Sequence, residues 1–107
     1  MKIFDLENEE GVKVAFEVSN LLLGRKAACR IAESIPGSKI LERPRLFRSK
    51  EEFCKFELGA KSFIIAEPYN DNSRYWVGPV PTEPCSEIEI VRAAFSKYKP
   101  VWWPFGA

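Results

Sequence analysis

Paired carboxylates are the first groups in this sequence that could do chemistry, because two nearby carboxyl groups can act as a general acid and a general base. Three pairs occur: Glu9/Glu10, Glu51/Glu52 and Glu87/Glu89. Neighbouring residues on a strand point to opposite faces, so the first two pairs are poor acid–base partners. The third pair falls in the first turn of a predicted helix, where the helix dipole favours negative charge. We therefore interpret none of the three pairs as catalytic.

The side chains that most often catalyse reactions or bind metals are missing from the sequence. The chain has no histidine, which is the commonest general base and the commonest metal ligand. Its three cysteines, Cys29, Cys54 and Cys85, form no C-x-x-C pair and make a poor zinc site without histidine. The glycine-rich P-loop pattern is also absent. We therefore predict a non-enzymatic protein without metal or cofactor, whose cysteines are reduced and mostly buried.

The segment 67–78 is the strongest candidate for a binding site, because a polar loop rich in turn-forming residues runs directly into aromatic and basic side chains. Tyr, Trp and Arg dominate the energetics of protein interfaces. The candidate contact residues are Tyr69, Asp71, Asn72, Arg74, Tyr75 and Trp76. A purely structural interpretation stays open, in which the polar residues bond to their own backbone and Tyr75 or Trp76 packs inward.

Charge is unevenly distributed, although the formal net charge is only +1 and selects no partner by itself. Residues 1–20 are mainly acidic, and four carboxylates there could steer a partner during association: Asp5, Glu7, Glu9 and Glu10. The segment 39–50 is basic and offers an alternative binding face through Arg43, Arg45 and Arg48. Nucleic-acid platforms usually combine several aromatics with basic residues, whereas Phe47 is the only aromatic in this segment. An acidic protein surface fits the segment equally well.

Hydrophobic periodicity predicts the elements that position these groups. Alternation of apolar and polar residues predicts strands at 2–6, 12–18, 39–42, 53–58, 62–67 and 74–80. A helix is predicted over 21–35, with Ser19 or Asn20 as its cap and Leu21 on its apolar face. A second helix is predicted from 84–86 to Pro100. Ser49 and Glu52 have the spacing of a capping box, but the alternation that follows them favours a strand.

These elements define an α+β fold in the order β-β-α-β-β-β-β-α, with a mostly antiparallel sheet of five or six strands and both helices packed on it. A length of 107 residues, 46% hydrophobic and 29% charged, fits one globular domain over 1–107. The aromatic tail, residues 100–107, is expected to fold back over the core, with a partner-binding tail as the alternative. The sequence contains no apolar leader and no run long enough to span a membrane, so we expect a cytoplasmic protein.

The stretch from Phe53 to Gly78 resembles small immunity proteins of bacterial polymorphic toxin systems, including those of contact-dependent growth inhibition. The resemblance covers about a quarter of the chain and rests on three runs: Cys-Lys-Phe-Glu-Leu-Gly at 54–59, Phe-Ile-Ile-Ala-Glu-Pro at 63–68 and Asp-Asn-Ser-Arg-Tyr-Trp-Val-Gly at 71–78. It is a pattern of strand, turn, strand and aromatic-rich loop without a catalytic signature. It implies a protein that binds a cognate toxin domain, often a nuclease, in a stoichiometric complex and blocks its active site.

The chain departs from that pattern in charge, because immunity proteins against basic nucleases are often strongly acidic and this one is nearly neutral. Either the toxin is not strongly basic, or the acidic run from Asp5 to Glu10 provides the steering. Two other functions remain open on the residues alone. One is a nucleic-acid-binding or regulatory module that uses the segment 39–50, and the other is a structural or adaptor subunit.

Overall fold

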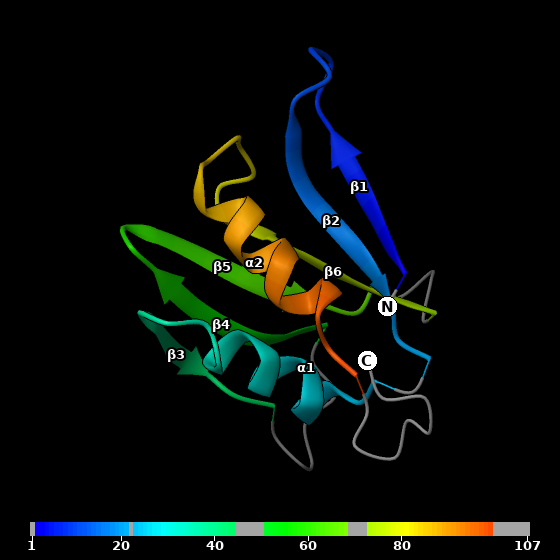
Figure 1. Ribbon diagram of the computed structural model, residues 1–107, viewed down its shortest axis with the longest axis vertical. Coiled ribbons are helices and arrows are strands. Elements are labelled where there is room, and N and C mark those ends of the chain that lie inside the picture. Colours follow the sequence, from blue (N-terminus) through cyan, green and yellow to red (C-terminus); the bar gives the residue numbers. More distant parts are fainter. Residues whose placement is uncertain (1, 22, 45–50, 69–72, 100–107) are drawn as a thin grey trace.

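Six strands and two helices follow one another in the predicted order β-β-α-β-β-β-β-α, so the α+β fold class is confirmed (Figure 1). The structure is a computed structural model that describes residues 2–21, 23–44, 51–68 and 73–99. The elements are β1 (Ile3–Glu7), β2 (Lys13–Ser19), α1 (Arg25–Glu33), β3 (Ser38–Glu42), β4 (Glu52–Leu58), β5 (Lys61–Ala66), β6 (Arg74–Pro79) and α2 (Glu87–Ser96).

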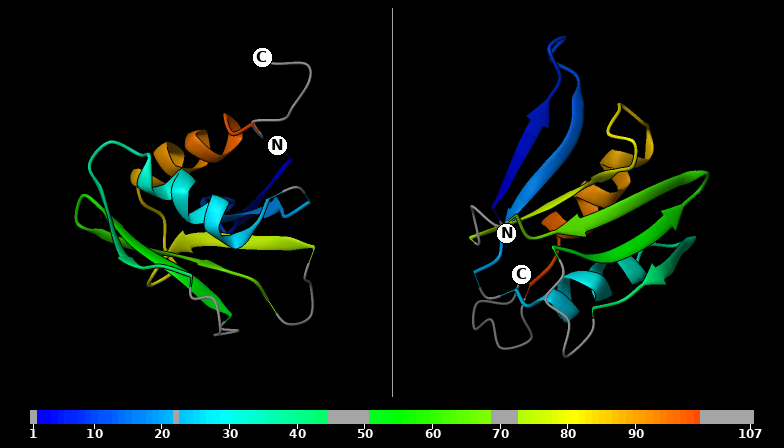
Figure 2. Two further views of the ribbon diagram at one scale, coloured as in Figure 1. Left: turned by 90° about the horizontal axis from the view of Figure 1, so that it is seen from below. Right: turned by 180° about the vertical axis from the view of Figure 1, so that it is seen from behind.

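The six strands form one antiparallel sheet in the spatial order β1-β2-β6-β5-β4-β3. The chain begins at one edge with the β1–β2 hairpin, crosses through α1 to β3 at the other edge, and returns strand by strand until β6 pairs with β2. Both helices lie on one face of the sheet (Figure 2). The other face has no covering element in the part of the chain that the structure describes. The two faces therefore hold different sets of side chains.

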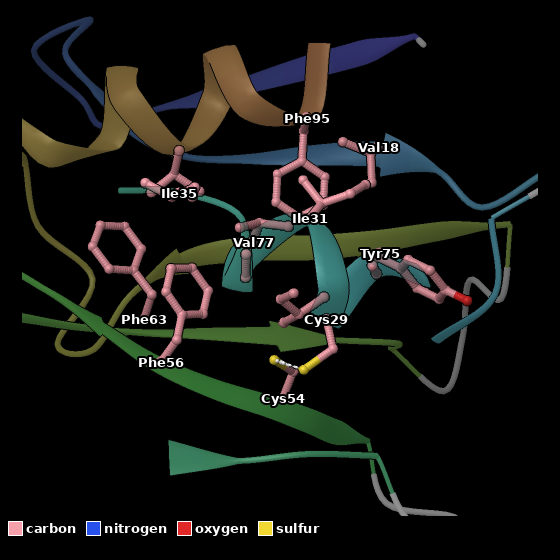
Figure 3. Packing of buried hydrophobic residues seen from close by; sticks show 14 of the residues in the cluster. Val18, Cys29, Ile31, Ile35, Cys54, Phe56, Phe63, Tyr75, Val77 and Phe95 are labelled. Carbon is pink, nitrogen blue, oxygen red and sulfur yellow. Dashed lines mark hydrogen bonds between the residues drawn. The ribbon is translucent and has the colours of Figure 1, made fainter. Parts of the chain in front are cut away.

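The core lies between the sheet and the helices (Figure 3). Side chains from the inner strands enter the core mostly at alternate positions, but β4 has a register shift between Glu52 and Cys54 and buries both Phe53 and Cys54. The pairs Phe56–Phe63 and Phe16–Phe95 have ring centroids 5.3 and 5.7 Å apart. The fully enclosed large side chains include Phe16, Phe56, Phe63, Phe95, Ile65, Val18, Val77 and Val91. Burial of one such side chain stabilises the fold by about 1.5–3 kcal/mol, so this layer is the main source of stability.

The first helix is shorter than the sequence predicted, because it begins at Arg25 and not at residue 21. Gly24 is its N-cap in an extended conformation, without a side-chain cap, so neither Ser19 nor Asn20 caps it. Leu21 is 77% exposed and does not belong to the apolar face, whereas Leu23 is buried. Two features stop the helix at this point: glycine disfavours helical conformation, and Leu23 is drawn into the core ahead of the first turn.

The second helix has the predicted spacing of apolar residues, but it ends at Ser96 and does not reach Pro100. α2 begins at Glu87 and buries Ile88, Val91 and Phe95 against the sheet, with Glu87 and Glu89 in its first turn. The strand interpretation of residues 53–58 is also confirmed, since Glu52 begins β4 rather than closing a helical capping box. The predicted tail at 100–107 lies outside the described residues. Among the described residues, no helix is both long enough and apolar enough to cross a membrane.

Candidate binding surface on the open face of the sheet

The face of the sheet that points away from the helices (Figure 2, right) is called the open face below. It carries Phe4 and Trp76, which are less buried than the other aromatic residues of the described strands. Strand register aligns Phe4, Glu17, Trp76 and Ala66 in one row across β1, β2, β6 and β5. These positions alternate with core positions along each strand, so the pleat directs their side chains outward. Phe4 and Trp76 are only partly buried in this row, and no described helix or strand covers them.

A second row extends the apolar surface next to the first. Leu6 pairs with Ala15 across β1 and β2, and Gly78 pairs with Ile64 across β6 and β5. Leu6 and Ile64 are partly buried. The two rows together make a mainly apolar patch that is continuous over four strands, and we call it the Trp76 patch. It consists of Phe4, Leu6, Ala15, Ile64 and Trp76.

Gly78 gives the indole of Trp76 room to lie flat on the sheet. A methyl group on Gly78 would lie 2.7 Å from Cη2 of Trp76 and 2.8 Å from Cβ of Ala15. The far end of the indole therefore occupies the space that a side chain at position 78 would fill. Glycine inside a strand marks this kind of close approach. The indole of Trp76 therefore packs closely on the backbone of Gly78 and the side chain of Ala15.

Arg74 forms the polar border of the Trp76 patch. Its guanidinium carbon lies 3.5 Å from the ring centroid of Phe4, and its Nη1 donates a hydrogen bond of 3.1 Å to Oε1 of Glu17. The side chain of Arg74 remains about one-third exposed. A cation stacked on an aromatic face and paired with a carboxylate is held in one orientation while its outer surface stays accessible.

The half of the open face over β4 and β3 is charged rather than apolar. Lys55 pairs in register with Ile64 at the border of the Trp76 patch, and its Nζ lies 4.0 Å from Glu42. Lys39 and Glu57 are paired farther along the same two strands. Both signs of charge alternate here, so this half adds little net potential of its own.

The structure divides the predicted recognition segment 67–78 between two locations. Arg74 and Trp76 lie on the open face, as described above. Tyr75 is only 4% exposed and points into the core, where its hydroxyl donates a hydrogen bond of 2.8 Å to the carbonyl of Leu23. This burial raises the pKa of Tyr75. The inward-packing interpretation therefore holds for Tyr75, and that side chain is removed from the accessible surface.

The remaining candidates of that segment, Tyr69, Asp71 and Asn72, lie outside the described residues. The open face also contains residues that the sequence interpretation did not single out, above all Phe4 and Ile64. Both are apolar residues at strand positions that alternate with core-facing positions. That pattern was the only sign in the sequence that they could belong to a binding surface. Only the pairing of β1 with β2 and of β5 with β6 places them beside Trp76.

The predicted steering carboxylates are not equivalent. Asp5 accepts a hydrogen bond of 2.7 Å from Nε of Arg92 on α2, and this contact lowers the pKa of Asp5. Glu7, Glu9 and Glu10 are exposed at the far end of the β1–β2 hairpin. Asp5 therefore joins the hairpin to α2, whereas the other three carboxylates are exposed near the hairpin turn.

The alternative basic face is only partly described. Arg43 forms an ion pair with Glu33 at the end of α1, and this contact lowers the pKa of Glu33. Arg45 and Arg48 lie outside the described residues. The described part of the segment therefore presents a neutralised Arg43 and an exposed Lys39.

The described part of the chain contains no metal-binding cluster. No three Asp, Glu or Cys side chains there lie close enough to hold a metal ion. A shallow groove of about 690 Å³ lies between α1 and α2 and is lined mostly by aliphatic residues such as Ile31, Ile35 and Ile90. Glu89 at its rim is already bonded to Lys13 at 2.6 Å.

Comparison with protein families, curated proteins and solved structures finds no match to this chain. The resemblance to immunity proteins therefore gains no support from known relatives, and the physical character of the open face has to carry the functional argument.

Proposed function

We propose that this domain is a non-catalytic binding protein that binds a partner protein through the Trp76 patch. We further propose that the partner is a bacterial toxin domain whose active site it blocks in a stoichiometric complex, as the resemblance to immunity proteins implies. One observation carries the proposal: Trp76, Arg74 and Phe4 form a partly exposed group on ordered strands, without a covering element in the described chain.

The composition of this group favours a protein partner. Trp and Arg are the residues whose truncation most often weakens an interface by 2 kcal/mol or more. Apolar surface flanked by an ion pair matches the usual arrangement of a hydrophobic interface centre and a polar rim. The order of the sheet lowers the entropy cost of binding, because the side chains on its central strands are already fixed before the partner arrives.

The acidic hairpin supports a toxin that carries positive charge. Glu7, Glu9 and Glu10 lie at the end of the hairpin whose strands also supply Phe4 and Glu17 to the open face. Exposed charges beside an interface act mainly on the association rate, and their effect is screened by salt. We expect these three carboxylates to steer the partner and the Trp76 patch to hold it.

The proposal predicts that a toxin domain is encoded beside the gene for this chain, and calorimetric titration with that domain tests it. Parent protein should bind with one-to-one stoichiometry and abolish the toxin's activity at equimolar ratio. Arg74→Ala should weaken binding by about 1–4 kcal/mol, because it removes a contact and exposes Glu17 without its partner. Glu9→Ala should mainly reduce the salt dependence of the association rate.

Arg30→Ala is the matched control for Arg74→Ala, because Arg30 is exposed on α1, which lies on the opposite face of the sheet from the Trp76 patch. It should bind like the parent protein. Equal weakening by both arginine variants would contradict the assignment of the binding face. Inhibition of the toxin at strongly substoichiometric amounts would contradict a non-catalytic mode of action.

Nucleic-acid binding by the segment 39–50 is the alternative function, and it predicts another pattern. Binding to a short oligonucleotide would fall steeply with salt and would be lost in Lys39→Ala and Arg43→Ala but retained in Arg74→Ala. That result, together with no affinity for the toxin domain, would replace the proposed function with the alternative.

A further inference from the structure

Two cysteines from distant parts of the chain meet in the core beneath α1 (Figure 3). Cys29 lies on α1 and Cys54 on β4, and their Sγ atoms are 2.8 Å apart. Both side chains are almost completely buried, with exposures of 2% and 0%. Neither is bonded in a disulfide, and Cys85 is a third free thiol at an intermediate depth.

The two thiols are chemically distinct. The S–H group of Cys54 donates toward the sulfur of Cys29, and this contact lowers the pKa of Cys29. The same contact and burial raise the pKa of Cys54. Cys29 is therefore the member of the pair that ionises first, and the thiolate is the form of cysteine that attacks an oxidant.

We propose that Cys29 and Cys54 are a redox-sensitive pair that forms an intramolecular disulfide when the protein meets a peroxide. The placement of the two sulfurs in direct contact on opposing elements carries this inference, because a disulfide needs both sulfurs within reach of each other without movement of the backbone. The inference is independent of the partner proposed above.

The reaction balances with hydrogen peroxide as the oxidant. The Cys29 thiolate attacks one peroxide oxygen, the O–O bond breaks, and the departing hydroxide takes up a proton to become water. The sulfur of Cys54 then attacks the resulting sulfenic acid on Cys29, the S–O bond breaks, and the hydroxide leaves as a second water with the Cys54 proton. Two thiols are oxidised to one disulfide, and one peroxide is reduced to two waters.

The bond would fasten α1 to the sheet. The two cysteines are 25 residues apart, so the disulfide closes a loop that contains the end of α1, β3 and the basic segment 39–50. Closing a loop of this length restricts the unfolded chain.

The experiment uses Cys85→Ser protein, in which the more accessible thiol cannot take part. The protein is treated with hydrogen peroxide, denatured, alkylated and digested with trypsin. We expect the peptide 27–30, which contains Cys29, to be linked to the peptide 51–55, which contains Cys54, and a reductant should release them. We expect the oxidised protein to melt on the order of 10 °C above the reduced protein.

Alkylation of both cysteines after peroxide treatment would overturn the proposal, and so would links that join two molecules. A linked pair without a rise in melting temperature would overturn its stabilising role. Peptide mapping of the parent protein after the same treatment tests the proposal without any substitution. The Cys29–Cys54 link should be the main disulfide found in that protein as well.

Discussion

Substitution of Gly78 by alanine tests the packing of the Trp76 patch. The structure predicts that this change lowers the free energy of unfolding, whereas the general effect of replacing glycine would raise it. Gly78 does not have a positive φ, unlike Gly11, Gly37 and Gly59, so its backbone conformation suits alanine. Without steric conflict, Gly→Ala would stabilise the protein by about 0.4–1 kcal/mol through the unfolded state. The structure instead places the new methyl group 2.7 Å from Trp76 and 2.8 Å from Ala15.

The steric conflict should outweigh the gain. Overpacking typically costs about 1–3 kcal/mol, so we expect Gly78→Ala to lower the free energy of unfolding by about 1–2 kcal/mol. The indole end can move aside, but the Ala15 side chain is fixed to its backbone and cannot. Urea unfolding followed by far-UV circular dichroism measures the change, and the melting temperature should fall by roughly 5–15 °C.

Two variants make this test specific. Gly24→Ala is the control, because nothing lies within 4 Å of its new methyl group and its effect should stay below about 1 kcal/mol. In a Trp76→Ala background the cost of Gly78→Ala should shrink, because one of the two crowded neighbours is gone. A Gly78→Ala protein as stable as its parent, or more stable, would refute the proposed packing of Trp76 on the sheet.

Three further predictions concern the residues around the patch. Tyr75→Phe should lower the free energy of unfolding by about 1–2 kcal/mol, measured by urea titration, because the buried Leu23 carbonyl loses its donor; an unchanged midpoint would contradict that hydrogen bond. The pKa of Asp5 is held below its ordinary value of 3.8 by Arg92, so this pair stabilises the fold above that pH and loses its effect as the pH falls through the folded pKa. Asp5→Asn should therefore reduce the loss of stability between about pH 5 and pH 2, and an acid limb that matches the parent would argue against the pair. Native reduced protein should show one thiol, Cys85, that reacts faster with Ellman's reagent than the two core thiols, and three fast thiols would contradict their burial.

Local pattern was sufficient to predict most of the elements. Alternation along β2, β5 and β6 and the helical spacing of Ile88, Val91 and Phe95 predicted strands and a helix that the structure contains. These patterns work because each element buries one face, and the period of the apolar residues reports that face directly. The start of α1 was not predictable in this way. It depends on the burial of Leu23 and its bond to Tyr75, a residue 52 positions away.

The open face needed tertiary information. Arg74 and Trp76 were candidates from their residue types alone, but their neighbours Phe4 and Ile64 come from two strands that only the order β1-β2-β6-β5 brings alongside β6. Tyr75 was a candidate because of its residue type, but it faces the core. Successive residues on a strand point to opposite faces, so Tyr75 points away from the face that holds Arg74 and Trp76. The contact between Cys29 and Cys54 likewise joins α1 to β4 across 25 residues.

The central claim is that the Trp76 patch binds the toxin domain, and the dissociation constant of Trp76→Ala tests it most directly. Calorimetry with the same toxin domain should give a constant at least about 30-fold above that of the parent protein, which corresponds to a loss of about 2 kcal/mol. Ile90→Ala, which removes an exposed apolar side chain from α2 on the other side of the sheet, should bind like the parent. A folded Trp76→Ala protein with an unchanged dissociation constant would contradict the account.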